Sequence, residues 1–179
     1  MRYLQKSNAE YSLFNTSWGW VGVIISERGI RRIILPQSNS DIIYEIIRNE
    51  SPLATFTSHA SDITQKITAY LSGQKVKFNN TLDYPNITQF QNDVYQTTCS
   101  IPYGETRSYS WVAKEIGNIR APRAVGQALA HNPTPIIVPC HRVISLSGNL
   151  QGFRGGIDMK KRLILMEKSV ARRKLQPDC

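Results

Sequence analysis

The segment from Ser108 to Ala130, SYSWVAKEIGNIRAPRAVGQALA, contains the clearest folding signals in the chain. Ser108 is a residue type that caps helices, and apolar residues follow it at helical spacing. Gly117 ends this first helix, and Pro122 takes the first position of a second helix, where a missing N–H has no cost. Two helices around a tight turn predict a helix-turn-helix. Many such pairs are only core packing, so the pattern alone is a weak signal for DNA binding.

A reactive cysteine is predicted just downstream of this segment. The apolar run 136–138 predicts a buried strand that leads into the tetrapeptide PCHR at residues 139–142. A cysteine reacts as the thiolate, which a nearby base or positive charge favours, and His141 and Arg142 supply both. Adjacent residues on a strand point to opposite faces, so His141 serves Cys140 only if the segment turns or a water relays the proton. The alternative is a buried, inert thiol beside a surface histidine.

The first half of the chain predicts a small α+β domain at residues 1–85. Residues 11–14 form a short apolar stretch that is expected to be β. Residues 18–26 are rich in β-branched and aromatic side chains, and residues 30–35 follow a turn signal as another strand, which predicts an antiparallel hairpin or meander. Ser40 and Ser61 are each positioned to cap a helix, and isoleucines follow both at helical spacing, which predicts two helices. The fold class expected here is therefore α+β with a small antiparallel sheet.

The second half predicts a mostly α-helical domain at residues 86–170 that contains the helix-turn-helix. Thr88 is positioned to cap one helix, and another is expected from about Asp158 to Lys168. Residues 171–179 form a basic, polar tail that we expect to be flexible.

Positive charge is concentrated in this second half. The formal net charge is +9; residues 1–85 hold nine basic and seven acidic side chains, whereas residues 86–179 hold thirteen and six. A basic half on a folded chain is typical of a protein that binds nucleic acid or another polyanion, although an ordinary basic surface gives the same count.

Several classes of protein are excluded by what the sequence lacks. No apolar run approaches the roughly 18–20 residues that span a bilayer, and the first residues lack the apolar segment of a secretory signal. Three cysteines, Cys99, Cys140 and Cys179, argue against a disulfide framework and for a reducing compartment. Zinc-binding and nucleotide-binding motifs are missing, so we expect no metal and no cofactor. The expected location is the cytoplasm, or the nucleus in a eukaryote.

Several separated segments, in order, resemble the O6-alkylguanine-DNA alkyltransferases, also called methylated-DNA–protein-cysteine methyltransferases. PCHRV at 139–143 resembles the active-site motif of that family, and IPYGETRSY at 101–109 and PRAVG at 122–126 are similar to two further family segments. The resemblance covers roughly residues 88–168, and it extends through Asn132-Pro133, Gly155-Gly156, Lys160 and Glu167. The N-terminal domain resembles the family only in its size and α+β character.

The resemblance implies a DNA-repair enzyme that acts once. Cys140 would irreversibly accept the alkyl group of O6-alkylguanine, and of O4-alkylthymine, to give S-alkylcysteine. His141 would be a general base acting through water, and Glu167 would fix its tautomer. Asn132 would hold the turn around the site, and Tyr109 would donate toward the guanine ring. Without the resemblance, the last three are read more simply as a solvated charge, a turn residue and a core residue.

The implied partner is double-stranded DNA that contains O6-alkylguanine. The lesion lies inside the base stack, so the nucleotide must be extruded, and contacts to phosphates and the minor groove should dominate for repair at any sequence. Arg123 matches the intercalating arginine of the family. The protein would be a monomer in solution that does not bind membranes. The other predicted DNA contacts are Ala121, Ala124, Gly126, Gln91, Ser110 and Asn118.

The resemblance also implies which residues flank the alkyl pocket. Residues Pro139, Val143, Phe153 and Arg154 would flank this pocket. No zinc is expected in the N-terminal domain, because His59 is the only histidine before residue 130 and no cysteine precedes Cys99.

Two alternative functions stay open. One is a non-catalytic protein that binds alkylated lesions, and the other is a cysteine hydrolase with a Cys140–His141–Glu167 triad.

Overall fold

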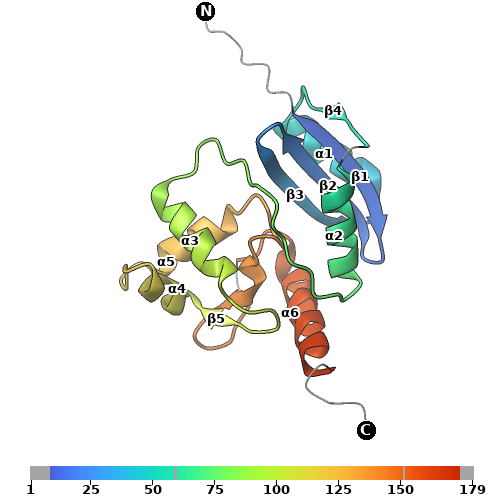
Figure 1. Cartoon of the computed structure of the whole chain (residues 1–179). Coiled ribbons are helices and arrows are strands. Elements are labelled where there is room, and N and C mark those ends of the chain that lie inside the picture. Colours follow the sequence, from blue (N-terminus) through green and yellow to red (C-terminus); the bar gives the residue numbers. More distant parts are fainter. Residues whose placement is uncertain (1–8, 59, 151, 174–179) are drawn as a thin grey trace, which may run out of the picture. The chain divides into compact units, whose positions relative to one another are not determined.

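The computed structural model describes residues 9–58, 60–150 and 152–173 (Figure 1). The chain divides into two compact units, Met1–Pro85 and Asn86–Cys179. His59 and Cys179, two residues considered above, lie outside the described residues. Within the described ranges, no helix is long and apolar enough to cross a membrane.

The first unit contains a four-stranded sheet in the order β3-β2-β1-β4. Strands β1 (Glu10–Thr16), β2 (Gly19–Ser26) and β3 (Gly29–Gln37) form the predicted antiparallel meander. Strand β4 (Thr55–Phe56) pairs in parallel with β1, so the sheet is mixed rather than purely antiparallel. The sequence did not predict β4, because two residues carry no detectable alternation of polar and apolar side chains.

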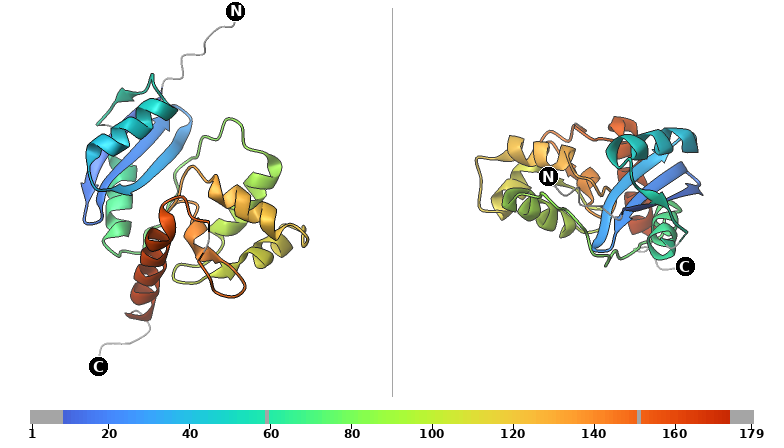
Figure 2. Two further views of the ribbon diagram at one scale, coloured as in Figure 1. Left: turned by 180° about the vertical axis from the view of Figure 1, so that it is seen from behind. Right: turned by 90° about the horizontal axis from the view of Figure 1, so that it is seen from above.

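Two helices cover opposite faces of this sheet (Figure 2). Helix α1 (Ser40–Glu50) packs on β2 and β3 through Ile43 and Ile47, and α2 (Ser61–Leu71) packs on β1. Asn39, rather than the predicted Ser40, caps α1, since its Oδ1 accepts a hydrogen bond of 3.0 Å from the backbone N–H of Ile42. Ser61, the predicted cap of α2, is instead its first residue, and Ala60 at the cap position provides no side-chain hydrogen bond. Both predicted helices are therefore present in this unit, but neither has the predicted cap.

The second unit is built around the predicted helix-turn-helix. Helix α4 (Tyr109–Glu115) and helix α5 (Pro122–Ala130) pack against each other, and α3 (Gln89–Cys99) packs against both. Ser108 caps α4, as its spacing predicted, and accepts a hydrogen bond of 3.0 Å from the backbone N–H of Trp111.

A short parallel pairing joins the cysteine segment to this helical pair. Strand β5 (Arg107–Ser108) pairs with β6 (Val143–Ile144), which directly follows the 3-10 helix η1 (Cys140–Arg142). The start of α4 and the cysteine segment are thereby fixed side by side.

The predicted strand at residues 136–138 is wrong. Residues 136 and 137 form a turn between the bridged residues Pro135 and Val138, and Ile136 has a φ of 79°. Val138 N–H donates to the carbonyl of Thr134 at 3.0 Å, which closes the turn locally. Pro135 and Pro139 flank the run and lack N–H groups, so the hydrogen bonds of a strand could not continue past it on either side. The segment is buried as predicted, but it bends.

Helix α6 (Gly156–Arg173) is longer than the predicted helix from Asp158 to Lys168. The first three residues of the predicted tail are therefore helical, and the rest of that tail lies outside the described residues. Arg172 and Arg173 occupy the last turn, where positive charge interacts favourably with the helix dipole.

Candidate active site

Cys140 lies at the start of η1 with only 6% of its surface exposed. Asn132, just beyond the end of α5, donates from Nδ2 to Cys140 Sγ at 3.2 Å and to the carbonyl of Val138 at 2.9 Å. Its Oδ1 accepts from the backbone N–H of Thr134 at 3.0 Å. One buried amide therefore holds both the bent segment and the sulfur.

The surroundings of the sulfur act on its ionisation in opposite directions. Burial raises the pKa of Cys140, whereas the hydrogen bond from Asn132, the charge of Lys160 and nearby backbone amides lower it. The net direction is upward, so Cys140 is a thiol in the resting protein at neutral pH. The groups that favour the thiolate are already in place, but a base must remove the proton.

His141 was predicted to be that base, and its orientation is fixed by Glu167. Both side chains are buried, and His141 Nε2 lies 3.0 Å from Glu167 Oε1. Burial lowers the pKa of His141, although Glu167 opposes this, so the imidazole is neutral. A neutral ring that donates Nε2–H to a carboxylate carries its lone pair on Nδ1. Nδ1 is therefore the basic nitrogen.

Glu167 also binds two other parts of the unit. Arg142 donates from Nε to Oε2 and from Nη2 to Oε1, each at 2.9 Å, and the backbone N–H of Gly104 donates to Oε2 at 3.0 Å. Burial would raise the pKa of Glu167, but the hydrogen bonds from His141 and Arg142 outweigh it and hold the pKa at about 2. The reading of Glu167 as a solvated charge is thus wrong, because only 1% of it is exposed.

Lys160 is a functional candidate to which the sequence analysis gave no role. It is 1% exposed, its Nζ donates to Tyr109 Oη at 3.4 Å, and the ammonium lies 5.6 Å from the centre of the Tyr109 ring. Burial lowers the pKa of Lys160 to about 8, and the charge of Cys140 opposes that change. Lys160 precedes Glu167 by seven residues, which places both on one face of α6. The seven-residue spacing from Glu167 was the feature of the sequence that could have indicated a role for Lys160.

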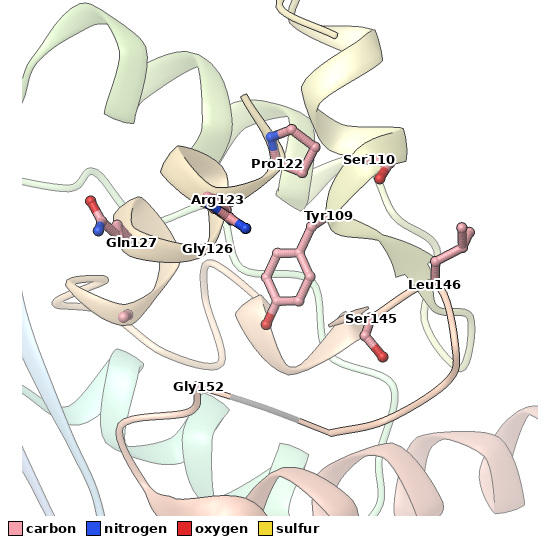
Figure 3. Close-up of a pocket in the computed structure, with 10 residues that line it drawn as sticks. Tyr109, Ser110, Pro122, Arg123, Gly126, Gln127, Ser145, Leu146 and Gly152 are labelled. Carbon is pink, nitrogen blue, oxygen red and sulfur yellow. The ribbon is translucent and has the colours of Figure 1, made fainter. Parts of the chain in front are cut away.

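A cavity of about 550 Å³ opens beside Tyr109 (Figure 3). Its walls come from the start of α4, from one face of α5 and from the loop after β6. The Tyr109 ring lies between the α5 wall and that loop. The residues that line it are Tyr109, Ser110, Pro122, Arg123, Gly126, Gln127, Ala130, Ser145, Leu146 and Gly152.

The predicted DNA-contacting residues divide into three groups. Arg123, Ser110 and Gly126 line the cavity, so the fold brings them together with Tyr109. Ala124 and Asn118 are exposed on α5 and on the turn before it, and Ala121 is the half-buried residue that precedes α5. Gln91 lies apart from these: its side chain accepts from the backbone N–H of Thr88 at 3.0 Å in the capping box of α3.

The four predicted alkyl-pocket residues do not line this cavity. Pro139 and Val143 are buried, Phe153 is half-buried and Arg154 is exposed. Their role stays a prediction. Gln127, Ser145 and Leu146 were not predicted to belong to the site, because nothing in the sequence indicates how the loop after β6 folds back toward α5.

Cys99 and His131 form hydrogen bonds with backbone carbonyls. Cys99 Sγ donates to the carbonyl of Ile137 at 3.6 Å, and His131 is exposed with Nδ1 2.8 Å from the carbonyl of Gln127. Across the part of the chain that is described, no three His, Cys, Asp or Glu side chains are grouped to hold a metal ion.

Comparisons with known proteins agree on one group of relatives. A family described as "6-O-methylguanine DNA methyltransferase, DNA binding domain" matches residues 89–169. The methylated-DNA–protein-cysteine methyltransferase of Mycobacterium tuberculosis is 49% identical over 111 residues, which are 62% of this chain and 67% of that protein. The enzyme of the same name from Methanosarcina acetivorans is 37% identical over 159 residues, 89% of this chain and 98% of that protein.

A solved structure extends the likeness to the fold. The crystal structure of Mycobacterium tuberculosis OGT in complex with DNA has a TM-score of 0.75 and 36% sequence identity, and the match covers 90% of this chain and 94% of that chain. The likeness therefore includes both units, and not only the segment that carries the motifs.

Proposed function

Because the chain belongs to the family of methylated-DNA–protein-cysteine methyltransferases, we propose that it repairs DNA by moving the alkyl group of O6-alkylguanine, and of O4-alkylthymine, to Cys140 Sγ. The observation that carries the proposal is the placement of this sulfur. Asn132 holds it, and a neutral imidazole with a buried carboxylate partner follows it in the chain. The acceptor is part of the protein, so the reaction needs no cofactor. The expected location is the cytoplasm, or the nucleus in a eukaryote.

The first chemical step is loss of the thiol proton. His141 Nδ1 accepts it through a bridging water, and Glu167 stabilises the resulting imidazolium at Nε2. The thiolate is stabilised in turn by Asn132 and by the positive charge of Lys160.

The second step is alkyl transfer. The thiolate attacks the alkyl carbon in line, a carbon–sulfur bond forms, and the bond between that carbon and the guanine oxygen breaks. The electron pair of the broken bond leaves the guanine ring negative, and Tyr109 Oη donates a proton to it. Lys160 Nζ, 3.4 Å away, returns a proton to Tyr109. The products are S-alkylcysteine, neutral guanine, neutral Lys160 and the imidazolium of His141, so charge and protons balance over the two steps.

The test of this function is to locate the transferred group. After incubation with a duplex that contains O6-methylguanine, mass spectrometry is expected to find one added methyl group, on the peptide that contains Cys140. Protein that stays unmodified while it binds the duplex would instead support a non-catalytic lesion-binding protein.

This protein binds DNA, and one nucleotide of the bound duplex is extruded from the stack and enters the site. The monomer binds the minor groove with the helix-turn-helix, and the extruded base enters the cavity beside Tyr109. Gly126 on α5 lines this cavity, and an added Cβ there would make only ordinary van der Waals contact with the Tyr109 ring, at 3.7 Å. Arg123, exposed on the cavity wall, fills the space that the base leaves.

The Arg123→Ala variant is expected to lower the rate of repair in a duplex about tenfold relative to its rate with free O6-benzylguanine, since only the duplex requires extrusion. The measurement is the ratio of the two second-order rate constants. Lys75→Ala, at an exposed position in the first unit, is the control for a lost positive charge. Equal losses on both substrates would contradict the intercalating role.

Alkylation of Cys140 is expected to lower the melting temperature of the protein. The sulfur is almost fully buried, and extra volume in a packed site typically costs about 1–3 kcal/mol, which corresponds to a drop on the order of 5 °C. Differential scanning calorimetry before and after reaction with O6-benzylguanine measures the change. The Cys140→Ser protein, treated in the same way, should melt unchanged. An equal or higher melting temperature for the alkylated protein would show that the added group is not strained.

A further inference from the structure

The turn after β6 carries an exposed leucine at the rim of the cavity. Ser145 to Gly148 form the turn, in which Gly148 N–H donates to the carbonyl of Ser145 at 3.0 Å and Gly148 has a φ of 80°. Ser145 N–H donates to the carbonyl of Asn149 at 3.2 Å, which holds the base of the loop. Leu146 is the second residue of the turn, and 85% of its surface is exposed.

Leu146 lies across the cavity from α5 (Figure 3). Leu146 and Ser145 form the loop side of the rim, and Arg123 and Gln127 form the α5 side. Tyr109 lies between the two sides. The residue proposed to fill the gap in the duplex and the exposed leucine thus belong to opposite edges of one opening.

A leucine at this position has no evident role in the free protein. Turns favour polar residues, glycine and proline, and a leucine with 85% of its surface exposed gains little from burial. The other large apolar residues exposed in the described part of this unit are Ile119, Ile157 and Leu165, and none of these lines the cavity. Single exposed apolar residues are common on protein surfaces, so the exposure of Leu146 alone indicates nothing. Its position on the rim of the proposed binding cavity, opposite Arg123, is what indicates a contact with the ligand.

Extrusion of a nucleotide supplies such a contact. The bases that flank the extruded nucleotide lose a stacking partner, and proteins that bind the minor groove insert leucine, isoleucine, phenylalanine or methionine against bases exposed in this way. We propose that Leu146 is an apolar wedge that packs against the base pair beside the extruded nucleotide, on the side of the gap opposite Arg123. The inference rests on the proposed function.

The alternative role for Leu146 is a contact with the alkyl group itself. That contact would exist with a free modified base as well as with a duplex, whereas a wedge acts only on a duplex. The ratio of the rate constant with a duplex to the rate constant with a free modified base therefore distinguishes the two roles.

The test is Leu146→Ser, which places a residue suited to turns at this position. We expect the ratio of the rate constant with an O6-methylguanine duplex to that with free O6-benzylguanine to fall about tenfold, the factor expected for losing one buried apolar contact. A 2-aminopurine placed beside the lesion should also show less unstacking on binding. Leu146→Met keeps an apolar side chain and is expected to recover most of the ratio.

Leu165→Ser is the matched control, because this exposed leucine lies on α6 and does not line the cavity. Its ratio should equal that of the unaltered protein. A Leu146→Ser ratio equal to that of the unaltered protein would overturn the wedge, and so would equal losses on both substrates. If the unaltered protein transfers no alkyl group from either substrate, the proposed function itself fails.

Discussion

The Cys140→Ser variant is expected to lose alkyl transfer by at least about 1,000-fold while it keeps its affinity for DNA within about twofold. A serine hydroxyl is far less acidic than a thiol, and neither His141 nor Lys160 is strong enough to ionise it at neutral pH. Serine still accepts the hydrogen bond from Asn132, so the bent segment and the adjoining helix α5 should keep their positions. DNA contacts on α5 should therefore survive.

Two measurements separate chemistry from binding in this variant. Transfer is measured with labelled O6-methylguanine duplex and mass spectrometry, and binding is measured by fluorescence anisotropy. Cys99→Ser is the matched control, because Cys99 lies at the end of α3 and should be replaceable with full transfer. Methyl groups found on Cys99, or transfer that persists in Cys140→Ser, would remove Cys140 from its role.

The Glu167→Gln variant is expected to lose both transfer and about 3–5 kcal/mol of unfolding free energy. The carboxylate faces Arg142, His141 and the backbone N–H of Gly104, and a neutral amide leaves the guanidinium without a buried counter-charge. The amide also cannot stabilise an imidazolium at His141. Urea denaturation measures the stability, and reaction with free O6-benzylguanine measures the chemistry without any contribution from DNA binding.

The difference in unfolding free energy between the unaltered protein and Glu167→Gln is expected to depend on pH. The pKa of Glu167 is about 2 in the folded protein, below its ordinary value of 4.5, so its contribution is fully present above pH 4.5. The contribution falls as the pH drops toward 2, and the two proteins should converge there. Glu105→Gln removes one partner of the exposed ion pair with Arg107 and is expected to lose less than about 1 kcal/mol. A loss of that small size in Glu167→Gln would disprove the structural role of the buried carboxylate.

Local signals predicted the elements whose patterns are complete within a short stretch. The meander β1–β3 and the pair α4–α5 follow from alternating or helical spacing with clear turn and cap residues, such as Ser108 and Pro122. The strand β4 was missed because its two residues are ordered by pairing with residues of β1 that lie 45 positions earlier, Glu10 with Thr55 and Tyr11 with Phe56. Local pattern does not contain that information.

The site followed the same division. Cys140 and His141 were identifiable because adjacent chemical groups are visible in a sequence. The resemblance, and not spacing, implied roles for Glu167 and Asn132. The bend at residues 136–138 was predicted as a strand, because apolar composition indicates burial but does not distinguish a strand from a buried turn. Lys160 was left without a role, since only the packing of α6 brings its ammonium to Tyr109.

Glu167 serves both the chemistry at His141 and the stability of the fold, and this has a consequence for variants that lose its carboxylate. A chain that loses this carboxylate loses the group that orients and stabilises its base, His141, together with about 3–5 kcal/mol of unfolding free energy, so it is expected to unfold and to be degraded by cellular proteases. Variants at this position should therefore seldom give inactive molecules that still bind lesions and block repair by intact copies.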